Sequence, residues 1–493
     1  MQPSKVVFNF YQNMRRVFTT IVSILFIANL FGQTSSDAID FSQVMYQGTA
    51  KATGMANALG AVGGDQTSIC INPAGMGLYR SSELNMSLGG LYNIMKSSYY
   101  DNVESSNRFR MNIPNVGFVS TTEKSNYSFI RFTQFGISLN RTNDYNMFST
   151  TRGLNPNSSL IDDYLGQIDG LSPYDIERQY PFTIFPAWQT YLIDTLNGYY
   201  TTPVPQGNLW QSQECDFKGR AEEWTFAFSA NCMDRLFLGA SIGLTHLKRF
   251  GTRTYKEEVP DGYHENDFRD WTYTEDLSSS GIGANLKLGF IYHANTWLRF
   301  GLAFHSPTIY NTDESWQTET IHQRRFDAPK YISPNSTYEY YLFTPLKWVG
   351  SVVFVGRNGM ISLDAEYTNF AKSKFDCTDE DYYDYTSTNK EIADLYGRTL
   401  NLRIGAEYML RSSYIRAGVA YYGSPQGFGK KDGSIKKASL GLSLIASEYV
   451  IFDFAYELTH GVTAYYLYNF NPIDPVTRNQ FRSNVVASMR IKF

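Results

Sequence analysis

Residues that could perform chemistry are few and scattered along this 493-residue chain. The six histidines include no HExxH pair, the spacing that places two metal ligands on one helix face. The chain has neither a P-loop nor a dinucleotide-binding fingerprint. Serine, histidine and aspartate are all present, but no arrangement singles out a nucleophile and its base. We therefore predict no catalytic residue and no cofactor, and expect a protein that is not an enzyme.

Two further sets of side chains could bind a metal or form a cross-link. The cysteines have no CxxC pair, so we expect no structural zinc site, although one disulfide in an extracytoplasmic loop stays open. A group of carboxylates could bind Ca²⁺, or could belong to a solvated loop that faces lipopolysaccharide. We predict no metal site. The cysteines are Cys70, Cys215, Cys232 and Cys377, and the carboxylates are Asp376, Asp379, Glu380, Asp381 and Asp384.

The composition is unusual for a cytosolic enzyme. The 43 basic and 47 acidic residues nearly cancel, which argues against a nucleic-acid partner. Charged residues make up 18% of the chain, below the roughly 25% of soluble proteins, and aromatic residues make up 16%. The mean hydropathy of −0.32 excludes a bundle of long apolar helices. These values suit a membrane β-barrel, in which only alternate residues face lipid.

The N-terminus is typical of a secretory signal peptide. Lys5, Arg15 and Arg16 precede an apolar run over residues 17–31, and small and polar residues follow. A membrane-anchoring helix is the competing interpretation, but it needs about 20 apolar residues and this run is shorter. We predict a signal peptide over residues 1–32, cleaved near Gly32.

Downstream, apolar residues recur with period 2, the period of a strand with one apolar face. In the last segment Val485, Ala487 and Met489 alternate with Val486, Ser488 and Arg490. Polar strand residues of this parity are expected to face a lumen, because a charge facing lipid at mid-depth costs roughly 2–4 kcal/mol. They include Asp364, Glu366, Arg403, Glu407, Asp453 and Glu457. Such runs centre near residues 88, 117, 135, 227, 244, 286, 302, 350, 364, 405, 418, 440, 454 and 488.

The connections between these fourteen runs fall into two classes. Short ones lie near residues 124, 233, 294, 357, 412 and 447, whereas long ones include 143–220, 256–276, 308–344 and 371–398. An even strand number with tight turns at one rim is typical of a transmembrane barrel, and a soluble β-sandwich would not explain it. In lipid an open sheet edge is not tolerated, so the first strand must pair with the last. The predicted fold is all-β: a 14-stranded antiparallel transmembrane β-barrel over residues 83–493, with long extracellular loops.

Residues 33–82 lack the period-2 pattern and are rich in glycine and alanine. A barrel of fourteen strands leaves a lumen that must be filled or left open as a pore. We therefore predict that residues 33–82 form an N-terminal hatch, or plug, inside the lumen. A periplasmic linker is the alternative, but it would not need so many apolar residues.

The long segment 143–220 contains an apolar stretch between Tyr180 and Leu192. In a surface loop this stretch could form an outer capture groove for an acyl chain, or could merely pack the loop onto the barrel rim. The candidate groove residues are Phe182, Phe185, Trp188 and Leu192.

The glycine- and alanine-rich stretch that runs through Asp65 into Asn72-Pro73-Ala74-Gly75 resembles the hatch of the FadL/TodX family, outer-membrane transporters of long-chain fatty acids and other hydrophobic compounds. Residues 113–119, 281–308 and 403–425 add weaker matches, so the resemblance spans about residues 45–493. It implies fourteen strands plugged by a hatch, with the ligand captured outside and released sideways through a gap in the wall. It also implies a hatch role for Asn72, Pro73, Ala74 and Gly75. The pocket residues and the ligand cannot be carried over, because the loops differ.

The resemblance implies passive uptake of long-chain fatty acids or other hydrophobic small molecules through the outer membrane of a Gram-negative bacterium. The expected partners are a hydrophobic ligand, outer-membrane lipid and the outer-membrane assembly machinery, which would recognise the C-terminal Phe493. We expect a monomer and no nucleic-acid partner. The alternative is a FadL-like barrel that serves as a protein-secretion accessory or shuttle subunit, with its long loops gripping a partner protein.

Overall fold

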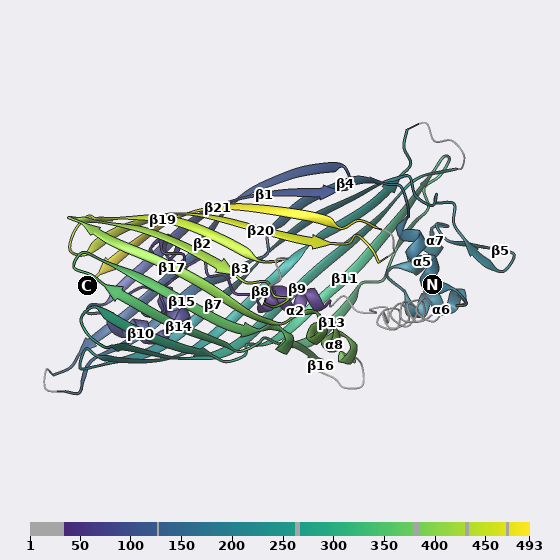
Figure 1. Ribbon diagram of the computed structural model, residues 1–493. Coiled ribbons are helices and arrows are strands. Elements are labelled where there is room, and N and C mark those ends of the chain that lie inside the picture. Colours follow the sequence, from purple (N-terminus) through teal and green to yellow (C-terminus); the bar gives the residue numbers. More distant parts are fainter. Residues whose placement is uncertain (1–33, 126–127, 262–266, 378–383, 429–432, 470–472) are drawn as a thin grey trace, which may run out of the picture.

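The computed structural model describes residues 34–125, 128–261, 267–377, 384–428, 433–469 and 473–493. Within them the wall is a closed barrel of fourteen antiparallel strands, as the sequence predicts (Figure 1). Closure comes from the pairing of the first strand, β1, with the last, β21. The predicted signal peptide lies outside the described residues.

Ten positions in the wall are single strands, and the other four are each built from two strands in line. The single strands are β1 (Glu83–Tyr99), β2 (Asn102–Glu123), β7 (Leu209–Cys232), β8 (Leu236–Glu258), β9 (Phe268–His293), β17 (Arg398–Leu410), β18 (Ser413–Tyr422), β19 (Ile435–Ile445), β20 (Val450–Tyr465) and β21 (Val476–Lys492). The pairs are β3 (Ile130–Asp144) with β4 (Met147–Asn155), β10 (Leu298–His305) with β11 (Ile309–Arg324), β13 (Ser336–Phe343) with β14 (Lys347–Val355), and β15 (Gly359–Asn369) with β16 (Lys374–Cys377).

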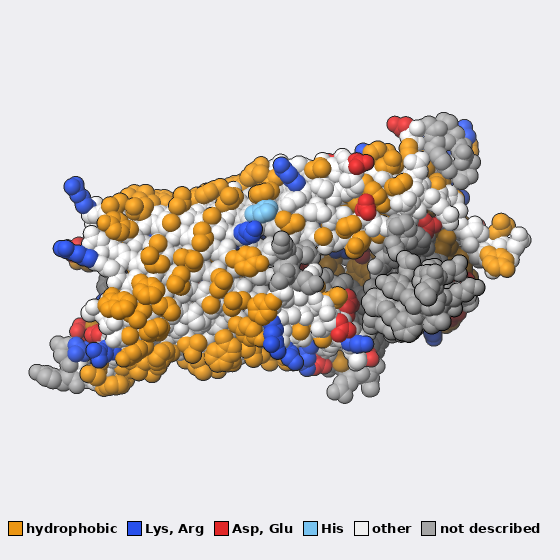
Figure 2. Space-filling model, in the orientation of Figure 1, with side chains coloured by type: hydrophobic (Ala, Val, Ile, Leu, Met, Phe, Trp, Pro, Cys, Tyr) orange, Lys and Arg blue, Asp and Glu red, His pale blue; other side chains and the backbone are white. Residues whose placement is uncertain are grey.

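An apolar belt surrounds the barrel on the outside. On β1, for example, Leu84, Met86 and Leu88 are exposed, whereas the alternate residues Asn85 and Ser87 are buried inside. Apolar side chains cover much of the visible wall towards the end that carries the C-terminus (Figures 1 and 2). An outward apolar face on a closed barrel is the surface that lipid requires. Among the described helices, none is both long enough and apolar enough to cross a bilayer.

The short turns lie at one end of the barrel, as predicted. In the turn between β7 and β8, Met233 and Asp234 have φ of 54° and 58°, the left-handed conformation of a tight hairpin turn. The long loops are shorter than the sequence indicates, because the strands extend beyond the belt. The predicted loop 143–220, for instance, contains β4 and the first half of β7. There both strand faces carry polar and aromatic side chains, so the apolar alternation fades although the hydrogen-bond ladder continues.

A helical lobe caps the opposite end of the barrel. Its helices are α5 (Leu160–Ile168), α6 (Pro173–Gln179) and α7 (Ile184–Gln189), followed by the hairpin β5 (Asp194–Leu196) and β6 (Tyr199–Thr201). The buried carboxylate of Glu257 on β8 holds this lobe to the wall, because it accepts hydrogen bonds from both. The donors are Ser159 Oγ, the Leu160 amide, Gln211 Nε2, Tyr255 OH and Trp271 Nε1, at 2.5–2.8 Å.

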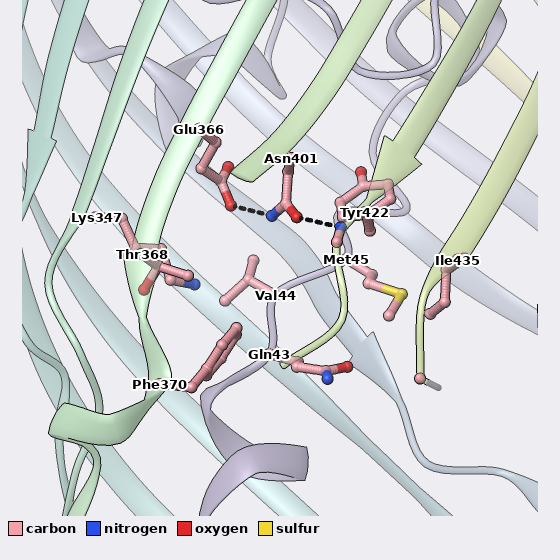
Figure 3. A pocket seen from close by; sticks show the side chains of 12 residues that line it. Gln43, Val44, Met45, Lys347, Glu366, Thr368, Phe370, Asn401, Tyr422 and Ile435 are labelled. Atoms are coloured by element: carbon pink, nitrogen blue, oxygen red, sulfur yellow. Dashed lines mark hydrogen bonds between the residues drawn. The ribbon is translucent and has the colours of Figure 1, made fainter. Parts of the chain in front are cut away.

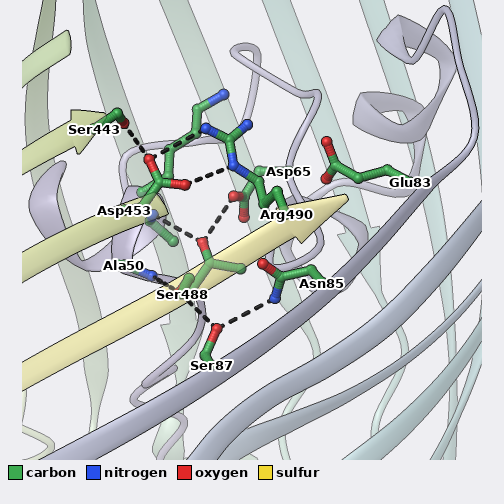
Figure 4. Close-up of polar contacts among 12 residues, drawn as sticks. Ala50, Asp65, Glu83, Asn85, Ser87, Ser443, Asp453, Ser488 and Arg490 are labelled. Atoms are coloured by element: carbon green, nitrogen blue, oxygen red, sulfur yellow. Dashed lines mark hydrogen bonds and ion pairs between the residues drawn. The ribbon is translucent and has the colours of Figure 1, made fainter. Parts of the chain in front are cut away.

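Residues 34–82, here called the luminal segment, lie inside the barrel. The segment contains α2 (Ser35–Ser42), α3 (Ala50–Gly54), α4 (Ser68–Ile71) and the 3₁₀ helix η1 (Pro73–Leu78). Its backbone amides bind side chains from widely separated strands: Ala50 N donates to Ser488 Oγ (2.8 Å; Figure 4), and Gly60 N donates to Asp364 Oδ2 (2.9 Å). Small residues are needed because the backbones approach closely. A Cβ at Gly54 would lie 3.0 Å from the Gly441 Cα.

The strand charges predicted to face the lumen do so, and five of the six form ion pairs there. Arg403 Nη1 lies 3.0 Å from Glu366 Oε2, and Lys437 Nζ lies 3.0 Å from Glu457 Oε1. Asp453 lies between two arginines, with Arg416 at 3.0 Å and Arg490 at 2.6 Å (Figure 4). These ion pairs line the lumen around the luminal segment, so the barrel is filled and not a wide pore.

Candidate functional site

One part of the wall is left without a backbone ladder. Among the described residues, β2 and β3 pair from Glu123↔Phe132 to Asn115↔Asn140, and the ladder ends there. The rest of β2, residues 102–114, pairs only with β1. We call the boundary between residues 102–114 and residues 141–155 the seam. It begins at Pro114, which has no N–H to donate and lies at a bulge opposite Leu88.

The luminal segment replaces β2 along the free edge of β3. Met45 N donates to Thr142 O (2.7 Å), and Gln47 N donates to Arg141 O (3.1 Å). On the other side of the seam, Asn112 Nδ2 of β2 donates to Gln47 Oε1 (2.7 Å). Residues 45–47 therefore satisfy groups that an open edge in lipid would leave unpaired. Displacement of these residues would leave the edge of β3 without these hydrogen bonds.

The outer side of the seam is apolar. Phe109, Met111 and Ile113 of β2 are 62%, 76% and 45% exposed. They lie opposite the belt residues of β1, since Tyr92 pairs with Phe109. An opening at this level would therefore lead from the lumen into the lipid and not into water.

Beyond the belt, side chains hold the seam together in place of a ladder. Arg108 of β2 forms a two-pronged ion pair with Asp216 of β7, at 2.5 and 2.8 Å, and its guanidinium lies 4.6 Å from the Phe148 ring centroid. Ser106 Oγ donates to Phe148 O (3.0 Å), and Asn102 Nδ2 donates to Arg152 O (2.9 Å). The potential opening is thus limited to the stretch of wall between Arg108 and Pro114.

Residues 43–45 also line a small cavity on the side of the lumen away from the seam (Figure 3). Apolar side chains from β19, β18 and the 3₁₀ helix η2 (Phe370–Lys372) face polar ones from β14, β15 and β17. The cavity volume is about 20 Å³, room for about one water molecule. A ligand larger than water would therefore have to displace residues 43–45. The side chains that line the cavity are Val44, Met45, Phe370, Tyr422 and Ile435 on the apolar side, and Lys347, Glu366 and Asn401 on the polar side.

Helix α2 anchors the start of the luminal segment, towards the lobe end of the barrel. Asp37 Oδ1 lies 2.5 Å from Arg249 Nη2 of β8, and the Arg249 guanidinium lies 4.7 Å from the Phe41 ring centroid. Burial alone would raise the pKa of Asp37, but the Arg249 charge and hydrogen bonds from Thr34 hold it below its usual range. Helix α2 is therefore anchored by a charged contact as well as by aromatic packing.

The hatch residues predicted from the resemblance lie away from the seam, against β8 and β9. Asn72 Nδ2 donates to Gly60 O (2.6 Å) and to Phe290 O (3.2 Å), and Asn72 Oδ1 accepts from Ala74 N (3.1 Å). The wall admits this block only because it carries glycine there: a Cβ at Gly239 would lie 2.3 Å from the Pro73 carbonyl carbon. Residues 72–75 thus hold the segment to the wall, while residues 40–47 reach the seam. The seam was not predicted from the sequence, although Pro114, a proline in the interior of a predicted strand, could have indicated it.

The candidate groove residues lie in the packed interior of the lobe region. Phe182, Phe185 and Leu192 are 7%, 8% and 0% exposed, and Trp188 is half-buried. Phe182 packs on Trp316 of β11, with ring centroids 4.5 Å apart. These contacts match the packing alternative, and a capture groove at these side chains stays a prediction.

The remaining sequence features have no role in the site. All four cysteines are unpaired, so the disulfide left open by the sequence does not form. In the acidic group, Asp376 contacts Lys374, and Asp384 Oδ1 accepts a hydrogen bond from the Thr386 amide at the start of α8 (Thr386–Leu395). Asp379, Glu380 and Asp381 lie outside the described residues. The described residues contain no group of three potential metal ligands. A GxSxG pattern does occur, at residues 239–243, but Ser241 is buried in mid-strand on β8 and not at a strand–helix turn.

Comparison with known proteins relates the fold to membrane channels. A FadL homologue from Pseudomonas aeruginosa superposes with a TM-score of 0.57 at 12% identity, over 91% of this chain and 98% of that one. The Pseudomonas putida toluene transporter TodX gives a TM-score of 0.51 at 12% identity, over 90% of this chain and 98% of that one. The sequence matches no family model and no curated protein. The chain therefore has the FadL/TodX fold, as the sequence resemblance predicts.

Proposed function

We propose that this protein is an outer-membrane channel for passive uptake of hydrophobic small molecules, with long-chain fatty acids as one candidate class. The observation that carries the proposal is the pairing of residues 45–47 with the free edge of β3. Among the described residues, the luminal segment takes the place of a wall strand where the β2–β3 ladder ends beside lipid-facing side chains. The solved structures of this fold include a transporter of toluene, which is itself a hydrophobic compound.

In the proposed mechanism the ligand enters from the lobe end, displaces residues 43–47 and leaves through the seam into the membrane. Burying an alkyl chain gains about 0.8 kcal/mol per methylene, so fifteen methylenes would contribute ~12 kcal/mol before costs. A rigid site of that strength would retain its ligand. A segment that must return to β3 to satisfy its backbone supplies the opposing free energy and favours release.

The proposal also includes export by a signal peptide and location in a Gram-negative outer membrane. It further includes recognition of Phe493 by the assembly machinery and a monomeric state. Phe493 exchanges backbone hydrogen bonds with Ser82 and is exposed at the end with the short turns. The secretion-accessory alternative has no specific observation in its favour among the described residues.

The test is mass spectrometry of organic extracts from the barrel purified in a mild detergent, beside an unrelated barrel prepared in the same way. A fatty acid or hydrocarbon enriched only in this protein, and taken up faster by cells that express it, would support the proposal. An empty barrel that neither binds nor accelerates uptake of any tested hydrophobe would refute it. A stoichiometric co-purifying protein would instead favour the accessory alternative.

A further inference from the structure

The uptake route proposed above does not use a group of cations on the outer face of β7 and β8. Arg220 and Lys248 are exposed and lie directly opposite each other across the two strands, with Lys218 two residues along on the same face. Like charges in directly opposite positions are destabilising unless something neutralises them. Arg220 contacts Glu222 at 2.7 Å, but among the described residues no carboxylate lies within 4.0 Å of the ammonium of Lys218 or Lys248.

The position of this group points to the lipid headgroups. On β7 the exposed belt residues Phe228, Phe226 and Trp224 are followed on the same face by Glu222 and then Arg220. On β8 the belt ends at Leu244, and Lys248 lies four residues farther along. The cations therefore lie directly beyond the apolar belt, on the lobe side, where the outer leaflet meets water.

Beside the cations the wall is hollowed. The hollow is a depression open to its surroundings, with a volume of about 620 Å³. Lys218 and Lys248 line it together with hydroxyl, amide and carboxylate groups that suit a sugar. Asp216, which also lines it, is already neutralised by Arg108. The remaining polar lining residues are Thr252, Asp276, Ser278, Ser315, Gln317 and Asn335.

We propose that the outer face of β7–β9 binds the phosphorylated sugar headgroup of an outer-leaflet glycolipid. Phosphate would neutralise Lys218, Arg220 and Lys248, since ammonium and guanidinium groups form strong charge-assisted hydrogen bonds to phosphate oxygens. Sugar hydroxyls would bind Asp276, Ser278 and Gln317. The acyl chains would continue along Trp224 and Leu244. The site lies on the opposite side of β4 from β2, and it borders the seam at Asp216, the ion-pair partner of Arg108.

The test is native mass spectrometry of the full-length barrel in detergent, titrated with diphosphoryl lipid A. Lys218→Gln with Lys248→Gln should weaken binding about tenfold, because two charge-assisted contacts are lost. The matched control is Lys96→Gln with Lys436→Gln, which removes the same charge from two exposed lysines on β1 and β19 and should leave binding unchanged. Heat-modifiable migration on gels verifies that both variants are folded.

Two probes distinguish the source of the phosphate. Lipid A stripped of its phosphates should bind weakly to the wild-type barrel, about as weakly as intact lipid A binds to the Lys218/Lys248 variant. Inorganic phosphate at millimolar concentration should not compete with lipid A for the site. Equal weakening in both variant pairs would overturn the proposal, as would tight binding of the dephosphorylated lipid. Full competition by inorganic phosphate would reduce the site to a simple anion site and also overturn it.

Discussion

The two edges of the β1–β2 hairpin meet their neighbours in opposite ways. On one side, β1 pairs with β21 in continuous register from Glu83↔Lys492 to Ser98↔Thr477, although these strands are the farthest apart in the sequence. On the other side, β2 pairs with β3, its nearest neighbour in the sequence along that edge, only as far as Asn115. The barrel is therefore completely closed where its chain ends meet and incompletely closed between strands that are consecutive in the sequence.

The contrast indicates that the gap at the seam is specified by this part of the chain and does not result from poor closure. Entropy favours pairing of strands that are close in sequence, so β2 and β3 would be expected to form the more complete ladder. The ladder stops next to Pro114 and the bulge opposite Leu88, and residues 45–47 satisfy the edge of β3 instead. A wall gap covered by a separable part of the same chain can open without unfolding the barrel.

The largest effect is expected from breaking the complete edge. Val485→Pro places in β21 the residue type that β2 tolerates at Pro114. It should prevent recovery of a folded barrel, because each backbone group left unpaired in lipid costs several kcal/mol. Heat-modifiable migration after refolding in detergent measures this. A folded, heat-resistant Val485→Pro barrel would show that the β1–β21 edge tolerates a break in its ladder as the β2–β3 edge does.

Fixing the incomplete edge should abolish uptake without affecting folding. In a Cys377→Ser background, Gln47→Cys and Asn112→Cys bridged by a short bis-methanethiosulfonate, which forms a disulfide with each thiol and releases sulfinate, would tie the luminal segment to β2, since these side chains are in hydrogen-bond contact. We expect hydrophobe uptake to fall about tenfold or more and to return on reduction. The matched control bridges Leu88→Cys and Ala487→Cys, which lie opposite each other across β1 and β21. If both bridges act alike, or neither acts, the seam is not the exit.

Restoring the backbone N–H that Pro114 lacks should have an intermediate effect on hydrophobe uptake. Pro114→Ala would allow the β2–β3 ladder to extend towards Arg141 and compete with residues 45–47. We expect uptake to fall about threefold with no loss of barrel stability, because one added ladder hydrogen bond contributes about 1 kcal/mol. Uptake kinetics and the thermal unfolding midpoint measure the two quantities. Unchanged uptake in a more stable barrel would show that the proline has only a structural role.

The smallest effect is expected at the charged end of the seam. Arg108→Ala removes the ion pair with Asp216, whose partly exposed groups contribute at most about 1 kcal/mol to stability. With this limit of the opening removed, we expect bulkier hydrophobes to be taken up about twofold faster, while small ones are unaffected. Uptake of a size series, with Arg152→Ala on the neighbouring strand as control, tests this. An equal change for all sizes would contradict the interpretation that Arg108 limits the opening.

The strand pattern could be predicted from the sequence because it depends on local alternation. All fourteen predicted centres lie within wall strands, and Glu366, Arg403 and Asp453 face the lumen as their parity indicates. The alternation disappears beyond the lipid, where neither face needs to be apolar. For this reason β4 and the first half of β7 were predicted as part of the loop 143–220.

The position of the luminal segment over the seam could not be predicted in this way. Residues 40–47 carry no motif, and their role arises from hydrogen bonds to Arg141, Thr142 and Asn112, which lie 65 or more positions away. The sequence determined that a barrel forms, because the membrane imposes a period on every strand. Only the tertiary structure decided where the wall is incomplete and what covers the gap, because that depends on which unpaired backbone edge a distant part of the chain can reach.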